Sequence, residues 1–205
     1  MRFVKSILNS YSIIFFSDKL FFAGLLLITS FFDYFAGLCG LISVITAYVV
    51  AETLGYDKHK IEKGYYGFNS LLAGLGLGLQ YQSNWAVLLI VVLASIFAFL
   101  VTVTFENLLS KYALPYLSLP FLVAYWVVTL VGRDLNILGL SGRGVFILND
   151  IYMLGGNWLL GVYEWWNSII IIPSIKVYFL SLGAIIFQYN VLAGIIIAAG
   201  ILYYS

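Results

Sequence analysis

A serine between two prolines is one of the few polar groups that the sequence places inside an apolar stretch. Residues 114–121 read LPYLSLPF, with Ser118 near the middle. Proline has no N–H and clashes with the preceding helical turn, so Pro115 and Pro120 are expected to free backbone hydrogen-bonding groups. A hydroxyl beside such groups can contact a small polar solute within a membrane. The competing interpretation is a Ser118 hydroxyl that bonds only to its own helix backbone.

Glycines divide a second apolar stretch, residues 64–78, which reads GYYGFNSLLAGLGLG. A membrane span needs about 20 apolar residues, and polar side chains at 80–84 interrupt this stretch before that length is reached. Glycine lets neighbouring backbones approach closely, and irregular backbone at membrane depth is tolerated only within protein or beside a water-filled path. We therefore expect a re-entrant pore half-helix over about 64–78. The alternative is an ordinary packing helix with small residues at its interface.

Other side chains that could perform chemistry are few and scattered. The chain has one histidine, His59, and one cysteine, Cys39, which cannot supply the ligand set of a metal site. Cys39 lies in an apolar run and is expected to be a small packing residue. The charged residues are confined to gaps between apolar runs, so neither a nucleophilic triad nor a pair of carboxylates is expected. We predict no enzyme, no metal and no cofactor.

Composition places the chain among membrane proteins. Of its 205 residues, 63% are hydrophobic and 9% charged, and the mean hydropathy is +1.03. Soluble domains do not have such a composition. These values predict an all-α polytopic membrane protein in contact with the lipid bilayer. A net charge of +1 gives no electrostatic reason to expect a nucleic-acid partner. A compact multi-pass chain of this kind is typical of a plasma-membrane protein, and of a bacterial inner membrane in particular.

The apolar runs predict the helices that must position these groups. Full-length spans are expected at 34–54, 85–105, 114–131 and, after the connector, 178–204. The runs 7–16 and 20–32 are shorter and predict either two tilted helices or one broken helix. Asp18 and Lys19, which lie between those two runs, are expected to reach the membrane interface. Residues 55–63 form a charged loop.

Basic residues give two indications of topology. Arg2 and Lys5 favour a cytoplasmic N-terminus, and Lys58, Lys60 and Lys63 favour an inside position for the 55–63 loop. Two separate spans between residues 7 and 32 would put these groups on opposite sides, so the side of the loop stays open.

Two further segments complete the organisation. Residues 133–177 are expected to be a connector whose aromatic cluster lies at the headgroup level, with Trp158, Tyr163, Trp165 and Trp166. The last segment repeats the first at an offset of 171, which aligns Ser10 with Ser181, Ile14 with Ile185 and Phe16 with Phe187, and with one gap Ala23-Gly24 with Ala193-Gly194. Many transport proteins consist of two such halves, often of inverted topology. The division expected is a first repeat at 1–132 and the first helix of an incomplete second repeat at 178–205.

Together these residues resemble the urea transporter family. Its pore-helix motif has the form G-x-x-G-[YF]-N-x-x-L-x-G and is matched by Gly64, Gly67, Phe68, Asn69, Leu72 and Gly74. Its second motif, L-P-x-x-T-L-P-F, is matched by residues 114–121, with Ser118 where the family usually has threonine. The order and spacing of the two motifs also agree.

The resemblance implies a passive channel for urea within an inverted-repeat fold, and homotrimers in which each protomer has its own pore. Planar urea would pass between phenylalanine slots and beside a ladder of oxygens. Carried over by position, Phe16 and Phe187 are the slot aromatics, Phe68 and Leu72 line the pore from its half-helix, and Ser118 keeps a central hydroxyl. Gly64, Gly67, Asn69 and Gly74 are the structural positions of that half-helix. No fixed charge is expected in the pore, so nothing would compensate the desolvation of an ion.

The sequence departs from the family at two pore positions. The family usually has a glutamine three residues before the first slot phenylalanine, and a glutamine or glutamate at the matching place of the second half. Here these positions are Ile13 and Ala184. The substitutions predict weaker urea binding, a different small amide or ammonia-like solute, or compensation by main-chain oxygens. Two alternatives to a working channel also stay open, namely a non-transporting membrane assembly protein and a truncated, inactive fragment.

Overall fold

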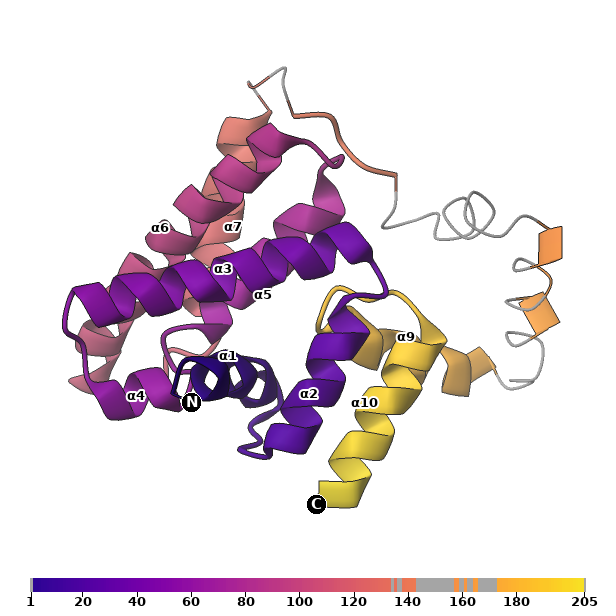
Figure 1. Cartoon of the computed structure of the whole chain (residues 1–205), viewed down its shortest axis with the longest axis horizontal. Helices are drawn as coiled ribbons and strands as arrows, with labels where there is room; N and C mark the ends of the chain where they lie inside the picture. The colour runs from indigo at the N-terminus through magenta and orange to yellow at the C-terminus, as the bar shows by residue number, and fades with distance from the viewer. Residues whose placement is uncertain are drawn as a thin grey trace.

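Every named element of the fold is a helix. The structure is a computed structural model that describes residues 2–133, 135, 138–142, 157, 158, 161, 164, 165 and 173–204. The elements are α1 (Arg2–Ser12), the 3₁₀ turn η1 (Ile13–Phe15), α2 (Leu20–Ser30), α3 (Tyr34–Thr53), α4 (Lys58–Glu62), α5 (Phe68–Gln80), α6 (Trp85–Ser110), α7 (Leu119–Gly132), α9 (Pro173–Ala184) and α10 (Val191–Tyr204). Figure 1 shows α3 crossing the molecule, with α6 and α7 on one side of it and α2 and α10 on the other.

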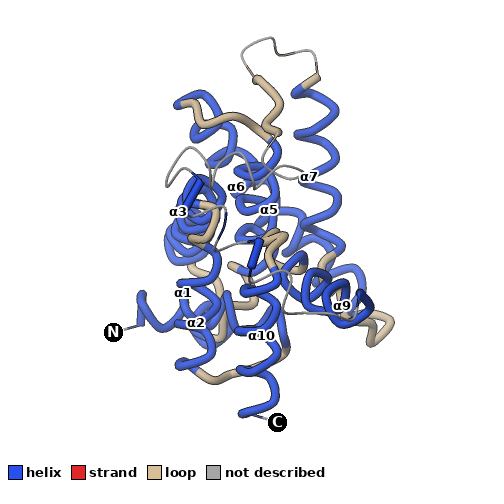
Figure 2. The backbone as a smooth tube through the Cα atoms, turned by 90° about the vertical axis from the view of Figure 1, so that its right-hand side faces the viewer, coloured by secondary structure: helices blue, strands red, loops and turns tan. Residues whose placement is uncertain are grey.

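The short helix α5 lies inside the first half of the fold. It packs against α3, α6 and α7, and Figure 2 shows it between these helices. All of its residues from Asn69 to Leu79 are buried. Its 13 residues begin at Phe68 and end at Gln80, slightly later than the expected range of 64–78. A separate helix, α6, follows after the Asn84 side chain caps its first turn by accepting from the Ala86 N–H.

Glycines allow α5 to approach α3 at backbone distance. A Cβ atom added to Gly74 would lie 2.6 Å from the Cys39 carbonyl oxygen, and one added to Gly78 would lie 2.8 Å from Ala36 Cα. Both distances are shorter than a carbon atom tolerates. The packing interpretation of the glycine spacing therefore holds for these two positions, where no larger side chain fits.

Two helices of the described residues are long and apolar enough to cross a membrane unaided, α3 with 20 residues and α6 with 26. A third crossing is possible if residues 2–15, which form α1 and η1, act together with α2 as one span. The two parts meet at an 85° bend. Residues 2–30 thus contain two helices separated by a sharp bend, and this geometry fits both one broken span and two short helices.

Several expected boundaries differ from those observed. The span expected at 85–105 continues to Ser110. The span expected at 114–131 begins only at Leu119, because Ala113 and Leu117 adopt left-handed backbone conformations with φ of 53° and 44°. Pro120 consequently stands in the first turn of α7, where its missing N–H leaves no helical bond unmade. The charged loop at 55–63 contains the short helix α4.

The segment 178–205, expected to be a single helix, forms two helices. The chain breaks after Ala184 and resumes at Val191. This break has the hydrogen bonds of the break after α1. Phe16 N–H donates to Ile13 O at 2.9 Å and Phe187 N–H to Ala184 O at 3.0 Å, while Ser17 donates to Ser12 and Gln188 to Gly183. Each pair of bonds forms a Schellman motif.

The left-handed residue of each motif is a phenylalanine. Phe16 has φ of 56° and Phe187 has φ of 59°. Helix ends of this type usually have glycine there, since a bulky side chain with positive φ is strained. Two phenylalanines in the same strained conformation, 171 positions apart, agree with the alignment of the first and last segments.

Most of the expected connector at 133–177 lies outside the described residues, including Tyr163 and Trp166. The described part returns to the end of α5, where Gln82 N–H donates to Gly139 O at 2.9 Å and Ser141 N–H to Gln80 O at 2.8 Å. Trp158 is exposed.

The N-terminus lies beside α4 (Figure 1). Lys5 Nζ and Glu62 Oε1 are 2.6 Å apart, and this ammonium lowers the pKa of the Glu62 carboxyl below its usual range. The Ser6 hydroxyl also donates to Ile61 O at 2.5 Å. The N-terminus and the 55–63 loop therefore lie side by side, and the side of the membrane that they face stays a prediction.

Gly64 offers a direct test of how closely α1 must approach the turn before α5. Its φ is 81°, and an added Cβ would lie 2.5 Å from Ser10 N. Gly55 has a similar φ of 72° but open space around an added Cβ. We expect Gly55→Ala to lower the free energy of unfolding by about 1 kcal/mol through backbone strain alone. Gly64→Ala should cost about 3 kcal/mol or more, because overpacking is added to strain.

Denaturant unfolding in detergent, followed by tryptophan fluorescence, measures both variants. Equal losses for Gly55→Ala and Gly64→Ala would contradict the close contact between α1 and residue 64.

Candidate functional site

One cavity of about 900 Å³ opens where both helix breaks meet α5 and the segment before α7. All seven residues expected to line a pore line this cavity, namely Ile13, Phe16, Phe68, Leu72, Ser118, Ala184 and Phe187. They come from four segments that are far apart in the sequence. The structural positions Gly64, Gly67, Asn69 and Gly74 do not line the cavity, and they pack against α1, α3 and the start of α7.

Phe187 is held in place by aromatic side chains of α7. Its ring lies 5.9 Å from that of Phe121 in an edge-on arrangement at 74°, and 6.4 Å from that of Tyr125 at 33°. A Cβ atom added to Gly76 would lie 3.0 Å from the Phe187 ring. The glycine at 76 therefore makes room for the ring, and Phe187 forms one aromatic wall of the cavity.

Phe16 has the same backbone conformation as Phe187 but different surroundings. Its side chain is 83% exposed, whereas Phe187 is half-buried. The two phenylalanines thus occupy equivalent turns, but only the Phe187 ring lies between α5 and α7.

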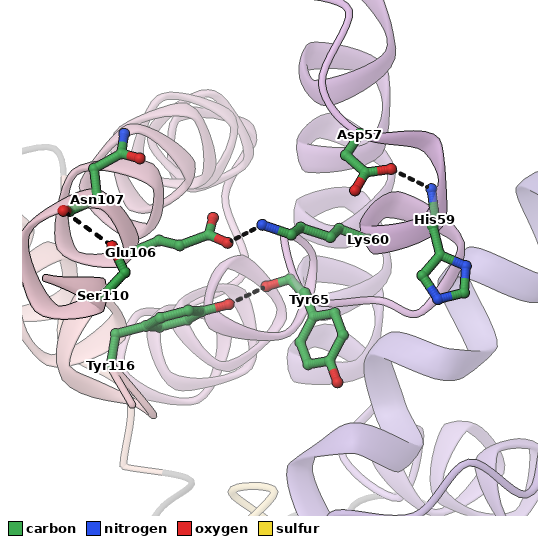
Figure 3. Close-up of polar contacts among 8 residues, drawn as sticks. All are labelled: Asp57, His59, Lys60, Tyr65, Glu106, Asn107, Ser110 and Tyr116. Atoms are coloured by element: carbon green, nitrogen blue, oxygen red, sulfur yellow. Dashed lines mark hydrogen bonds and ion pairs between the residues drawn. The ribbon is translucent and has the colours of Figure 1, made fainter. Parts of the chain in front are cut away.

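Phe68 forms a second aromatic wall at the start of α5. Its ring is stacked on that of Tyr116 with centroids 6.1 Å apart and an angle of 26°. The Tyr116 hydroxyl donates to Tyr65 O at 3.2 Å (Figure 3). This bond ties the segment before α7 to the turn before α5. Leu72 continues the same face of α5 one helical turn later.

Ser118 is the residue before the first turn of α7, but its hydroxyl does not cap that helix. Its main-chain carbonyl accepts from the Leu122 N–H at 3.2 Å. Within the part of the chain that the structure describes, the Ser118 hydroxyl has no hydrogen-bond partner and lines the cavity. The interpretation in which this hydroxyl bonds only to its own helix backbone is therefore not the one observed.

Asn69 holds the break before α7 in shape. Its Nδ2 donates to Leu117 O at 3.2 Å, and its Oδ1 accepts from the Phe121 N–H at 3.2 Å. The side chain is fully buried, and both contacts are partly buried. One amide thus satisfies a carbonyl and an N–H on the two sides of Ser118, which fixes the place of that hydroxyl at the cavity wall.

Comparison with known families decides what this arrangement is. The family model described as Urea transporter matches residues 4–205. The chain belongs to the urea transporter family. A separate comparison with curated protein sequences finds no match. Membership implies passive transport of urea across a membrane, and it identifies the chain as a transport protein of an α-helical membrane family.

The cavity of this urea transporter differs from the sequence prediction in its charges. No fixed charge was expected in the pore, and Asp18 was expected at the membrane interface. The structure places both Asp18 and Lys63 in the cavity lining, and the position of Asp18 relative to the membrane interface stays a prediction. Asp18 follows the turn at Phe16, and this turn determines the course of its backbone. The sequence pattern did not predict the geometry of the turn.

Several further lining residues were not predicted as such. Among those that carry polar groups are Asn9, Tyr65 and Tyr116. Asn9 lies one helical turn before Ile13, and its Nδ2 donates to Glu62 O at 2.7 Å. The position of Asn9 on the helical face of Ile13 was the available signal. Tyr65 and Tyr116 lie within the two family motifs at variable positions, so only their contact in the fold reveals them.

One ion pair lies near the cavity but outside its lining. Lys60 Nζ lies 2.5 Å from Glu106 Oε1, and this hydrogen bond raises the pKa of Lys60 (Figure 3). It joins α4 to the end of α6. Among the described residues, no group of three or more His, Cys, Asp or Glu side chains could hold a metal ion.

The Asn69 bridge can be tested by removing its polar atoms. Asn69→Leu leaves the Leu117 carbonyl and the Phe121 N–H without this partner, and each buried unpaired group costs about 1–3 kcal/mol. We expect a loss of about 3 kcal/mol of unfolding free energy, and faster amide hydrogen exchange over residues 117–122.

The neighbouring Ser70→Ala is the matched control. The Ser70 hydroxyl donates to Ser95 O at 3.0 Å, on the side of α5 that faces α6. This variant should lose about 1 kcal/mol and leave exchange at 117–122 unchanged. Unchanged exchange in Asn69→Leu would show that the bridge does not hold the break.

Proposed function

We propose that this urea transporter conducts urea through the cavity formed by the two helix breaks, α5 and the residues before α7. The observation that carries the proposal is the meeting of Phe16, Phe68, Ser118 and Phe187 in one cavity. These residues were selected from the sequence by motif and by alignment of two distant segments. Aromatic walls beside a hydroxyl suit a flat, neutral solute.

The chemistry of the lining supports a neutral amide. A buried amide group without a partner costs about 1–3 kcal/mol, so a solute that leaves water needs acceptors along its way. The Ser118 hydroxyl is one such group. Aromatic rings limit the width and offer nothing to replace the hydration shell of an ion. The lining therefore favours an uncharged molecule with several N–H donors.

Equivalent breaks at Phe16 and Phe187 support an inverted-repeat pore. Phe187 lies between α5 and α7. In the proposed arrangement, a second pair of helices equivalent to α5 and α7 would lie beside Phe16 in the same way. The division into a first repeat at 1–132, a connector at 133–177 and a second repeat from 178 belongs to this proposal.

The outer surface supports a place among lipids or neighbouring subunits. On α6, apolar side chains at four-residue spacing are exposed, among them Trp85, Leu89, Leu93 and Phe97. Such a stripe on a 26-residue helix suits a bilayer or a helix of another copy. We include in the proposal a homotrimer in a plasma membrane, of the bacterial inner-membrane type, with a separate pore in each protomer.

Two substitutions test the conduction path. Phe16→Ala removes an aromatic ring from the cavity lining, and Ser118→Val removes the hydroxyl while having the shape of threonine. We expect each to lower urea permeability about tenfold, the effect of losing about 1.4 kcal/mol of stabilisation along the path. Ser118→Thr, which retains the hydroxyl, should conduct as the parent protein does. Stopped-flow light scattering of proteoliposomes with urea, formamide and ammonia gives the three fluxes.

Controls outside the cavity match each change. Phe97→Ala removes an exposed aromatic ring of α6, and Thr104→Val removes an exposed hydroxyl that bonds to Leu100 O of the same helix. Both should leave urea flux unchanged. Parent flux equal to that of protein-free vesicles would contradict conduction and favour a packing role for the glycines and aromatics.

A further inference from the structure

Two opposite charges line the cavity and are not engaged in ion pairs. Asp18 and Lys63 both border it, and both side chains are exposed. Among the described residues, the ion pairs join Lys5 to Glu62 and Lys60 to Glu106. Lys63 therefore stands beside two paired residues of the same loop while its own ammonium has no carboxylate partner there. Its charge is available to a molecule in the cavity.

The backbones that carry these two side chains are fixed. Asp18 follows the Schellman motif at Phe16, in which Ser17 N–H donates to Ser12 O at 3.2 Å. Lys63 ends α4, and its N–H donates to His59 O at 3.0 Å. The next residue, Gly64, is held against α1 by the close contact with Ser10. Both charged side chains thus begin at hydrogen-bonded turns. The ordered backbone there reduces the conformational entropy lost when the side chains bind a solute.

We propose that Asp18 and Lys63 form a dipolar subsite that binds amides at the cavity mouth and selects them over ammonia. The inference rests on the proposed conduction of urea through this cavity. The Lys63 ammonium would donate to the carbonyl oxygen of the solute, and the Asp18 carboxylate would accept from its N–H groups. Hydrogen bonds to charged groups are about twice as strong as neutral ones.

This subsite takes the place of the polar contacts that the sequence lacks. Ile13 and Ala184 line the cavity with apolar side chains where the family resemblance implies glutamine. An amide has both a carbonyl acceptor and N–H donors, so it can satisfy both charges at once. Ammonia has no carbonyl oxygen and gains nothing comparable from Lys63. One positive and one negative group also cancel at a distance, so the mouth does not concentrate ions of either sign.

Neutral variants separate the subsite from the rest of the path. We expect Asp18→Asn and Lys63→Gln each to lower urea and formamide flux about fivefold, a modest effect because both groups are exposed to water. Ammonia flux should not change. The controls are Glu52→Gln and Lys58→Gln, which remove exposed charges outside the cavity and should leave every flux unchanged. Urea flux that stays at the parent level, or falls in proportion to ammonia flux, overturns the proposal.

A binding measurement distinguishes failure of the subsite from failure of conduction. Ser17→Cys places a thiol in the cavity lining between Phe16 and Asp18, while the native Cys39 is buried. Urea bound at the mouth should slow reaction of this thiol with the neutral reagent methyl methanethiosulfonate. Protection should be lost when Asp18→Asn or Lys63→Gln is added.

The two measurements lead to different conclusions. Protection without urea flux in the parent protein would contradict the proposed conduction and support the subsite. Flux with no protection, or with equal protection in all three thiol variants, would overturn the subsite and leave conduction supported.

Discussion

The fold depends on finding a partner for each backbone polar group that its helix breaks release. A bilayer interior offers no water to unpaired N–H and C=O groups, yet this chain interrupts its helices after Ser12, before Leu119 and after Ala184. The first and last breaks close on themselves through Schellman bonds, and the middle one is bridged by Asn69. The Gln188 amide adds a bridge to another turn, because it donates to Ser30 O and accepts from the Asp33 N–H. The cavity exists because these turns are stable enough to border it.

The sequence predicted the parts of this fold that depend on local pattern. Run length and hydropathy located α3 and α6, and glycine spacing located the short buried α5. Boundaries set by left-handed residues were missed, since φ at Ala113 or Leu117 depends on packing around the break. The break after Ala184 was missed because Gln188 and Asn190 are two isolated polar residues in a mostly apolar segment, and such residues do not by themselves indicate a turn.

The cavity lining was predicted well for residues that belong to motifs or to the internal alignment, such as Phe68 and Phe187. It was predicted poorly for charges. Asp18 was assigned to the interface because a carboxylate between two apolar runs usually lies there. Asp18 borders the cavity because it follows the turn at Phe16, and sequence spacing does not describe that turn.

The phenylalanines at 16 and 187 have one more consequence. At a left-handed position glycine would relieve about 1 kcal/mol of backbone strain or more, so each turn is less stable than a simple replacement would make it. A bulky ring at this position lowers the stability of the turn and gives the cavity wall its shape. Selection for thermostability alone would favour glycine at both turns, and a heat-adapted variant obtained in that way would have lost two aromatic rings from the cavity lining.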